Sequence, residues 1–220
     1  CVPTCHALAR LMGAATRPAS SSAVRIGSGE LEVAAASFDS TPPLGVPAPT
    51  LGVNPVVQEI QGPLETRVFA IRQGDLTLGF ASTDCAAFDP CRERLSEALH
   101  IPVEQTIVAS THVHATFHNT ALTDMGEQGV GRKFYTAFER TAAMLPGRFE
   151  RVTVAYGKGI EDTITYNRKG RRADGTTYFM REEDRVKLPA DYSGLIDPVA
   201  SVLRFDGAGG KPRLLLTHFT

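Results

Sequence analysis

Two histidines separated by one residue stand out in the sequence as candidates for catalysis or metal binding. His112 and His114 lie in the segment 110–118 (STHVHATFH), directly after the apolar run 106–111, which has the length of a buried strand. Because alternate side chains of an extended backbone share a face, we expect both imidazoles to project to the same side where the chain leaves the sheet. They could bind one metal together, or one could bind metal while the other takes part in acid–base chemistry. The alternative is that they only end the strand and hydrogen-bond to loop carbonyls.

The spacing of residues along the sequence does not identify the further ligands or supporting side chains of such a site. A catalytic zinc ion needs three protein ligands and one open position, so further ligands would have to come from elsewhere in the chain. His218 and the carboxylates are candidates, whereas His118, in the loop after His114, fits a packed or solvated side chain better. Asp84 follows the expected strand 76–82 and either orients an imidazole or caps the loop after that strand.

A second polar feature is the basic cluster 167–172 (NRKGRR). It could meet an anionic substrate or lipid headgroups, and the alternative is a solvated loop, as is usual for a single run of charge. No phosphate-binding loop and no Gly-x-Ser-x-Gly nucleophile motif is present. These absences leave the histidines as the main candidates for chemistry.

The four cysteines form two close pairs without C-x-x-C spacing: Cys1 with Cys5, and Cys85 with Cys91. The pairs fit two disulfides of a secreted protein or four free thiols of a cytosolic one. Cys1 itself has three interpretations: a boundary of the sequence, the mature end of a bacterial lipoprotein, or an N-terminal nucleophile that uses its own α-amino group as base.

The composition fits one sizeable domain or two small ones in a chain of 220 residues. The hydrophobic share is 42% and the charged share 21%, which excludes a disordered chain. With 23 basic and 24 acidic residues the net charge is −1, which argues against a nucleic-acid-binding protein. No apolar run approaches the roughly 20 residues that span a bilayer, so we expect no transmembrane segment.

The elements that would position these residues follow from periodicity and turn signals. Apolar residues at helical spacing mark the best helix of the chain, and glycine-containing turns join two expected hairpins. The expected strands are 31–36, 67–72, 76–82, 106–111, 151–157, 200–205 and 213–219, and the expected helices are 90–100 and 131–145. This order predicts an α/β fold with a layered mixed β-sheet, flanking helices and a C-terminal hairpin.

The order of several motifs resembles the N-terminal catalytic region of the neutral/alkaline ceramidase-like family. The resemblance covers 40–220 and leaves 1–39 as a leading segment. The motifs are 41–47 (TPPLGVP), 81–84 (ASTD), 107–114 (IVASTHVH), Asn167 with Arg168, and Asp197-Pro198 leading into the strand 202–205 (VLRF).

The resemblance implies a zinc-dependent hydrolase of C–N amide bonds with an N-acyl or ceramide-like substrate, either a small molecule or a lipid. It makes His112 a zinc ligand and places His114 to act on the reacting carbonyl. The metal would lower the pKa of a bound water and so supply the attacking hydroxide. The resemblance also puts Asn167 and Arg168 near the site.

Two departures from the family pattern shape the expectations. Residues 115–117 (ATF) replace the Ser-Gly-Pro of the family, which puts ceramide itself in question. The second zinc histidine of the family would fall just beyond Thr220, so the domain would be incomplete without a downstream segment and active only with it. We therefore expect a C-terminal half as partner, either as a continuation or as a separate subunit of a heterodimer after autocleavage at Thr220.

Two other functions remain open from the sequence. Cleavage after Thr220 could expose a nucleophilic N-terminal residue beside His112 and His114, giving a metal-free N-terminal-nucleophile amidase. A non-catalytic binding protein that has lost the site is the other alternative. A secreted, periplasmic or lipoprotein location is slightly favoured over the cytoplasm.

Overall fold

The computed structural model describes residues 29–46, 56–85, 91–114, 116, 122–164, 167–171, 174–179 and 196–219. The chain divides into two compact units. The first contains Cys1–Thr153 and Gly207–Lys211, and the second contains Val154–Asp206 and Pro212–Thr220.

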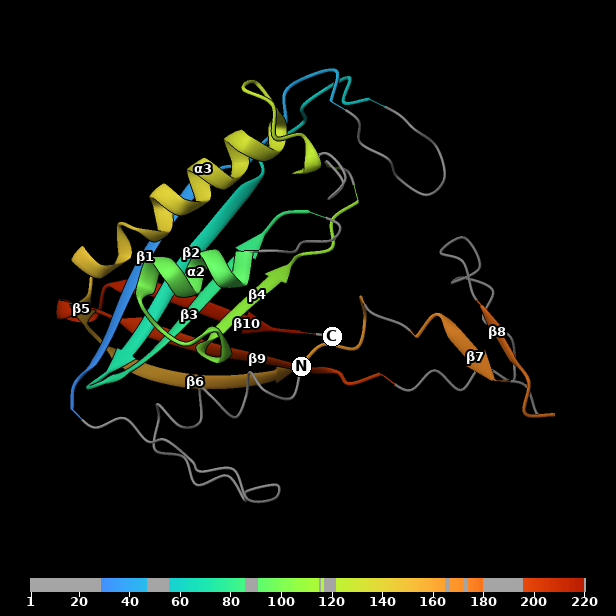
Figure 1. The fold of residues 1–220 in the computed structure, drawn as a ribbon. Coiled ribbons are helices and arrows are strands. Elements are labelled where there is room, and N and C mark those ends of the chain that lie inside the picture. Colours follow the sequence, from blue (N-terminus) through green and yellow to red (C-terminus); the bar gives the residue numbers. More distant parts are fainter. Residues whose placement is uncertain are drawn as a thin grey trace. The chain divides into compact units, whose positions relative to one another are not determined.

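The first unit is built on a five-stranded mixed sheet in the order β4-β3-β2-β1-β5 (Figure 1). Its strands are β1 (Leu31–Asp39), β2 (Glu65–Gln73), β3 (Leu76–Thr83), β4 (Thr106–Ser110) and β5 (Glu150–Arg151). β3 and β4 pair in parallel, and the other neighbours pair antiparallel. β1, β3 and β4 therefore run in the same direction, so their carboxyl ends meet at one edge of the sheet.

The expected hairpin between β2 and β3 is confirmed. Gly74 has a positive φ of 57° in the two-residue turn, a conformation that favours glycine. Val68 to Ile71 are all buried in β2, and Phe69 stacks on Phe80 of β3 with ring centroids 4.7 Å apart. The hairpin therefore forms the centre of the sheet.

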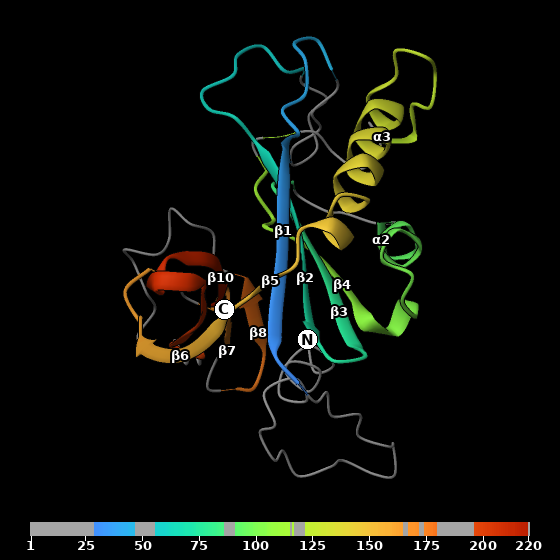
Figure 2. The ribbon, with the colours of Figure 1, turned by 90° about the vertical axis from the view of Figure 1, so that its left-hand side faces the viewer.

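Helices α2 (Cys91–Leu99) and α3 (Val130–Ala142) lie on the same side of this sheet (Figure 2). A short 3-10 turn, Val103–Gln105, leads from α2 into β4, and another, Leu145–Gly147, follows α3. Arg94 joins the helices, because its guanidinium pairs with Glu139 of α3 and lies over the Tyr135 ring. The apolar face expected for the helix 131–145 is confirmed, although α3 ends at Ala142 and the last member lies in the 3-10 turn after it. All of its members are buried: Phe134, Phe138, Thr141, Ala142 and Leu145.

Gly131 sets how closely α3 approaches the segment before it. A Cβ at this position would lie 2.0 Å from the carbonyl oxygen of Leu122, which is a backbone atom that cannot move aside alone. We expect Gly131→Ala to lower the free energy of unfolding by about 1–3 kcal/mol in a urea titration. Gly147→Ala is the control, because a Cβ there meets nothing within 4 Å; equal losses for the two variants would contradict the packing described.

The second unit contains a three-stranded sheet in the order β10-β9-β6 and a two-stranded pair, β7 with β8. The larger sheet consists of β6 (Thr153–Ile160), β9 (Val199–Asp206) and β10 (Pro212–His218), with the 3-10 turn Ala208–Gly210 between the last two strands. The expected C-terminal hairpin is therefore confirmed. The small pair consists of β7 (Lys169–Arg171) and β8 (Thr177–Phe179), neither of which is among the strands expected from the sequence.

The prediction of a single strand at 151–157 is wrong. Arg151 ends β5 and pairs with Glu32 of β1, whereas β6 begins at Thr153 and belongs to the other sheet. The period-two alternation marks extended backbone correctly, but it does not determine which neighbour each half pairs with. The mixed sheet, its helices and the final hairpin still confirm the α/β class.

Two further expectations concern cysteines and membranes. Cys85 and Cys91 are buried in the core of the first unit and are not joined by a disulfide, while Cys1 and Cys5 lie outside the described residues. Within the described part of the chain, no helix has both the length and the apolar character needed to cross a membrane.

Candidate functional site

The carboxyl edge of the five-stranded sheet gathers the polar residues that follow β1, β3 and β4. His112 and His114 follow β4, and Asp84 follows β3. The Thr111 N–H donates to the carbonyl oxygen of Thr83 over 3.0 Å, so the pairing of β3 with β4 continues to the residue before His112. Ligand sites of α/β sheets commonly form at the carboxyl ends of strands, and we take this edge as the candidate site.

The two histidine rings contact each other. Their centroids are 4.7 Å apart and the ring planes are nearly perpendicular, at 84°. Both side chains are exposed. The rings therefore lie close together as the sequence predicted, and both side chains are accessible from solvent.

The backbone at His112 does not have the extended conformation that the sequence predicted. β4 ends at Ser110, and His112 has a positive φ of 63° instead of an extended conformation. This left-handed region is uncommon for residues other than glycine, although histidine, asparagine and aspartate adopt it more often than most. Such conformations cost about 1–3 kcal/mol and cluster at functional sites. The turn at His112, rather than strand alternation, sets the geometry of the pair.

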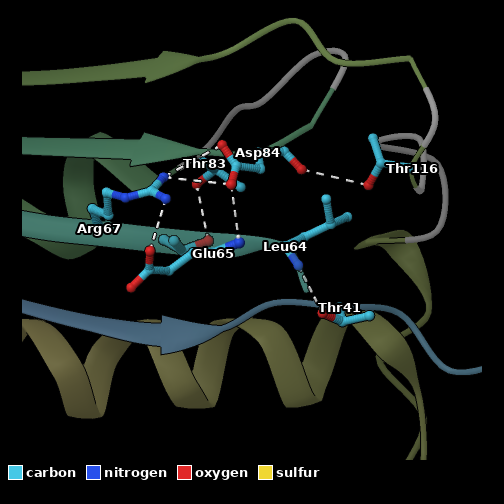
Figure 3. A network of polar contacts seen from close by, with 8 residues as sticks. Thr41, Leu64, Glu65, Arg67, Thr83, Asp84 and Thr116 are labelled. Carbon is cyan, nitrogen blue, oxygen red and sulfur yellow. Dashed lines mark hydrogen bonds and ion pairs between the residues drawn. The ribbon is translucent and has the colours of Figure 1, made fainter. Parts of the chain in front are cut away.

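Asp84 lies in a network of polar contacts with the start of β2 (Figure 3). Its carboxylate accepts a hydrogen bond from the Glu65 N–H over 3.1 Å and lies 3.4 Å from the guanidinium of Arg67. Arg67 also pairs with the Glu65 carboxylate, at 2.7 Å. These contacts join the Asp84 carboxylate to the start of β2, and not to an imidazole or to the loop that follows β3, so both roles that the sequence left open for Asp84 stay predictions.

Threonine hydroxyls extend this network across the edge (Figure 3). The Thr116 hydroxyl donates to the carbonyl oxygen of Asp84 over 3.4 Å, which fixes the chain just beyond the histidines. Thr66 and Thr83 are fully buried, and their hydroxyls lie 3.2 Å apart. The segment after His114 is thus tied to the end of β3.

The chain that leaves β1 is held at the same edge. The Asp39 carboxylate accepts from the Thr41 N–H over 2.8 Å, and hydrogen bonding by Thr41 holds the pKa of Asp39 below its ordinary value. The Thr41 hydroxyl in turn accepts from the Leu64 N–H over 2.8 Å. The hydroxyl of the intervening Ser40, which is 8% exposed, has no hydrogen-bond partner among the residues that the structure describes. The TPPLG loop therefore starts at the same edge of the sheet as the histidine-bearing loop.

The donors at this edge match zinc in type but not in number. Imidazole nitrogens are common zinc ligands, and a catalytic zinc site needs three protein ligands. His112 and His114 supply two, and no group of three or more His, Cys, Asp or Glu side chains able to hold a metal exists among the described residues. The described residues therefore do not complete a zinc site.

The other site residues that the sequence suggested belong to the second unit. The Asn167 side chain accepts a hydrogen bond from the Lys169 N–H over 2.9 Å, and the Arg168 guanidinium lies over the Phe179 ring. His218 ends β10 and is exposed. His118 lies outside the described residues. The roles of Asn167 and Arg168 in a site with the histidines stay predictions.

Sequence reasoning missed Arg67, Glu65 and Asp39 at this edge. A signal for them was present, because Asp39 and Asp84 directly end or follow strands that run in the same direction, and Glu65 begins the strand between them. Charged residues at the ends of neighbouring strands meet once the strand order is known. That order depends on pairing between distant segments, which a local pattern does not specify.

Asp84 is expected to act as a positioning residue. We expect Asp84→Asn to weaken the hydrogen bond to the Glu65 N–H and the Arg67 pair, to cost about 1 kcal/mol in stability, and to lower kcat of the amide hydrolysis that the sequence predicts about tenfold by shifting the loop after β4. Glu32→Gln is the control. Its carboxylate pairs with Arg72 at 2.8 Å near the start of β1, at the opposite end of the same sheet, and hydrogen bonding by Arg72 lowers the pKa of Glu32. An equal fall in kcat for both variants would contradict a positioning role.

Comparison with solved structures identifies similar folds. The chain is similar to a neutral ceramidase from Pseudomonas aeruginosa, with a TM-score of 0.59 and 18% identity, over 86% of this chain and 31% of that one. It is similar to a ceramidase complexed with C2 over the same shares, with a TM-score of 0.57 and 18% identity. The chain thus spans about a third of the length of these structures. No protein-family model matches it, and neither does any curated protein. The ceramidase resemblance seen in the order of motifs is confirmed at the level of the fold.

Proposed function

We propose that the chain is the histidine-bearing part of a hydrolase that cleaves the C–N bond of N-acyl amides, with ceramide-like lipids as the substrate class. The observation that carries the proposal is the contact between the His112 and His114 rings, centroids 4.7 Å apart, at the carboxyl edge of the sheet. The similarity of the fold to two ceramidases supports the choice of substrate.

In the proposed reaction, water adds to the amide carbonyl carbon and the C–N bond breaks, giving a carboxylic acid and an amine. His114 donates a hydrogen bond to the carbonyl oxygen as negative charge develops there, and carries a proton between the water and the leaving nitrogen. Its exposure leaves the ring open to substrate. Asn167 and Arg168 take the role of positioning the polar part of the substrate in this proposal.

Zinc is the cofactor that we propose for this site, with His112 as a ligand. Imidazole is a favoured donor for zinc. Because the described residues supply two imidazoles and no third ligand, the remaining ligands would lie outside them, and no catalytic step is assigned here to the metal. A downstream segment of the same precursor, continuous or separate, is the proposed source, in line with the 31% of the neighbour that this chain covers.

A binding protein without catalytic activity is the second candidate function. Residues 115–117 (ATF), which replace the Ser-Gly-Pro of the family, favour a protein that binds N-acyl lipids on the same fold without cleaving them. A folded protein that binds a ceramide and releases no product from any N-acyl amide would support this alternative.

The test of the proposal is an assay of N-acyl amide hydrolysis by the protein at its natural length, with and without a chelator. We expect cleavage that the chelator abolishes and that added zinc restores. Full activity of a metal-free sample would contradict the zinc part and favour the N-terminal-nucleophile alternative. Intact-mass measurement of the same sample then distinguishes one continuous polypeptide from two fragments.

The location of the protein is proposed to be outside the cytoplasm, as a secreted, periplasmic or lipid-anchored protein. The close spacing of Cys1 and Cys5, which fits a disulfide of a protein in an oxidising compartment, supports this proposal. Detection of the protein in the cytosolic fraction alone would contradict it.

A further inference from the structure

The β7–β8 hairpin of the second unit combines basic side chains with an exposed aromatic ring. β7 and β8 pair antiparallel in a ribbon of two strands (Figure 1), and Lys169 lies directly opposite Phe179 in the register. Residues paired in this way have neighbouring side chains on the same face of the ribbon. An ammonium group and an aromatic ring therefore share one face.

The Phe179 ring is 62% exposed, which is unusual for so large an apolar side chain. The guanidinium of Arg168 lies over this ring, 5.3 Å from its centroid. A cation above an aromatic face is favourable where water is partly excluded. Phe179 and Arg168 thus form an amphipathic pair, and most of the apolar ring stays exposed beside the cation.

The charge of this region is strongly positive. Four of the five residues at 168–172 are basic, in a chain whose net charge is −1. Arg168 and Lys169 have no carboxylate partner among the described ion pairs. The acidic residue of the turn, Asp174, is engaged locally, because its carboxylate accepts from the N–H and the hydroxyl of Thr176 over 2.9 and 2.7 Å.

We infer that the β7–β8 hairpin docks on the surface of an anionic lipid bilayer. The basic residues attract the lipid phosphates, and the Phe179 ring enters the interface between headgroups and acyl chains. The inference deepens the proposed function and rests on it, because a lipid amide substrate would be drawn from such a surface. A single-stranded nucleic acid fits less well, because it requires successive aromatic side chains as stacking platforms, and Phe179 is the one exposed ring among the side chains of the hairpin that the structure describes.

The inference is tested by sedimentation of the protein with vesicles of phosphatidylcholine, with and without phosphatidylglycerol. We expect binding to the vesicles that contain phosphatidylglycerol, and weaker binding as salt is raised. Since each basic residue near an anionic surface strengthens binding about fivefold, Lys169→Glu should weaken it about tenfold or more, and Lys169→Gln about fivefold. Phe179→Ser should weaken binding several-fold at every salt concentration, because the loss is apolar.

Two control variants separate docking by this hairpin from a general effect of charge and from hydrolysis. Lys133→Glu makes the same change of charge at an exposed position of α3 in the first unit, and should bind vesicles as the wild type does. His112→Asn should also bind normally, because these vesicles contain no amide lipid, so a failure of the proposed hydrolysis leaves this result unaffected. The inference is overturned if binding does not depend on phosphatidylglycerol, if Lys133→Glu loses as much binding as Lys169→Glu, or if Lys169→Glu loses RNA binding and not vesicle binding.

Discussion

Replacing His112 by asparagine is expected to lower kcat/KM for N-acyl amide hydrolysis about 100-fold or more. The variant removes one of the two imidazoles in contact at the carboxyl edge of the sheet. Asparagine is chosen because it tolerates the left-handed backbone, φ 63°, better than most residues. The backbone of the loop should therefore survive, so that the loss reports on the side chain. Steady-state kinetics on a ceramide-like amide measure the effect.

His100 provides a matched control for this variant. It is also exposed and also has a positive φ, of 54°, but it follows α2 at the other end of β4. His100→Asn makes the same chemical change in the same backbone conformation away from the site, and should leave the rate unchanged. Equal rates for wild type and His112→Asn would rule out a role for this imidazole in catalysis.

Replacing Phe138 by alanine is expected to lower the free energy of unfolding by about 3–5 kcal/mol. The Phe138 side chain is 0% exposed and lies in the core between α3 and the sheet, together with Phe134 and Leu95. Alanine leaves a cavity at the centre of this cluster, and the surrounding helices and strands can fill it only in part. Urea titration followed by circular dichroism measures the loss.

Phe179→Ala is the matched control for the stability measurement. The chemical change is the same, but the Phe179 ring is 62% exposed, so the free energy of unfolding should stay within about 0.5 kcal/mol of wild type. A loss for Phe138→Ala no larger than that for Phe179→Ala would contradict the assignment of this helix face to the core.

The elements with strong local signals were predictable from the sequence. The helical spacing of Phe134, Phe138 and Leu145 identified the buried face of α3, because a helix in a layered fold must bury one apolar stripe. Gly74 identified the β2–β3 turn, because its conformation is one that glycine adopts readily. In both cases the information lies within a few residues along the chain.

The elements that depend on distant partners were not predictable. The segment 151–157 alternates like one strand, yet β5 pairs with β1 while β6 joins a different sheet. β7 and β8 contain three residues each, which is too short for periodicity to be recognised. Pairing between distant segments decides these cases, and a local pattern does not contain it.

The proximity of the two histidines in the candidate site was predictable from the sequence, whereas the turn and the polar network around them were not. The spacing of His112 and His114 placed the two rings together, but the left-handed turn that orients them has no signal in the local pattern. The link between Asp84 and Arg67 depends on the register of β2 with β3, which the sequence did not supply. The family resemblance rested on the order of motifs, and the fold agrees with it even at 18% identity.

The most direct test of the central proposal is analysis of the products formed from a ceramide-like amide in water enriched in heavy oxygen. We expect the protein at its natural length to release amine and carboxylic acid in equal amounts, with one heavy oxygen atom in each acid molecule. Neither product should form with His114→Asn. Release of both products at the wild-type rate by His114→Asn, or no release from any N-acyl amide by the folded wild-type protein, would contradict the proposed function.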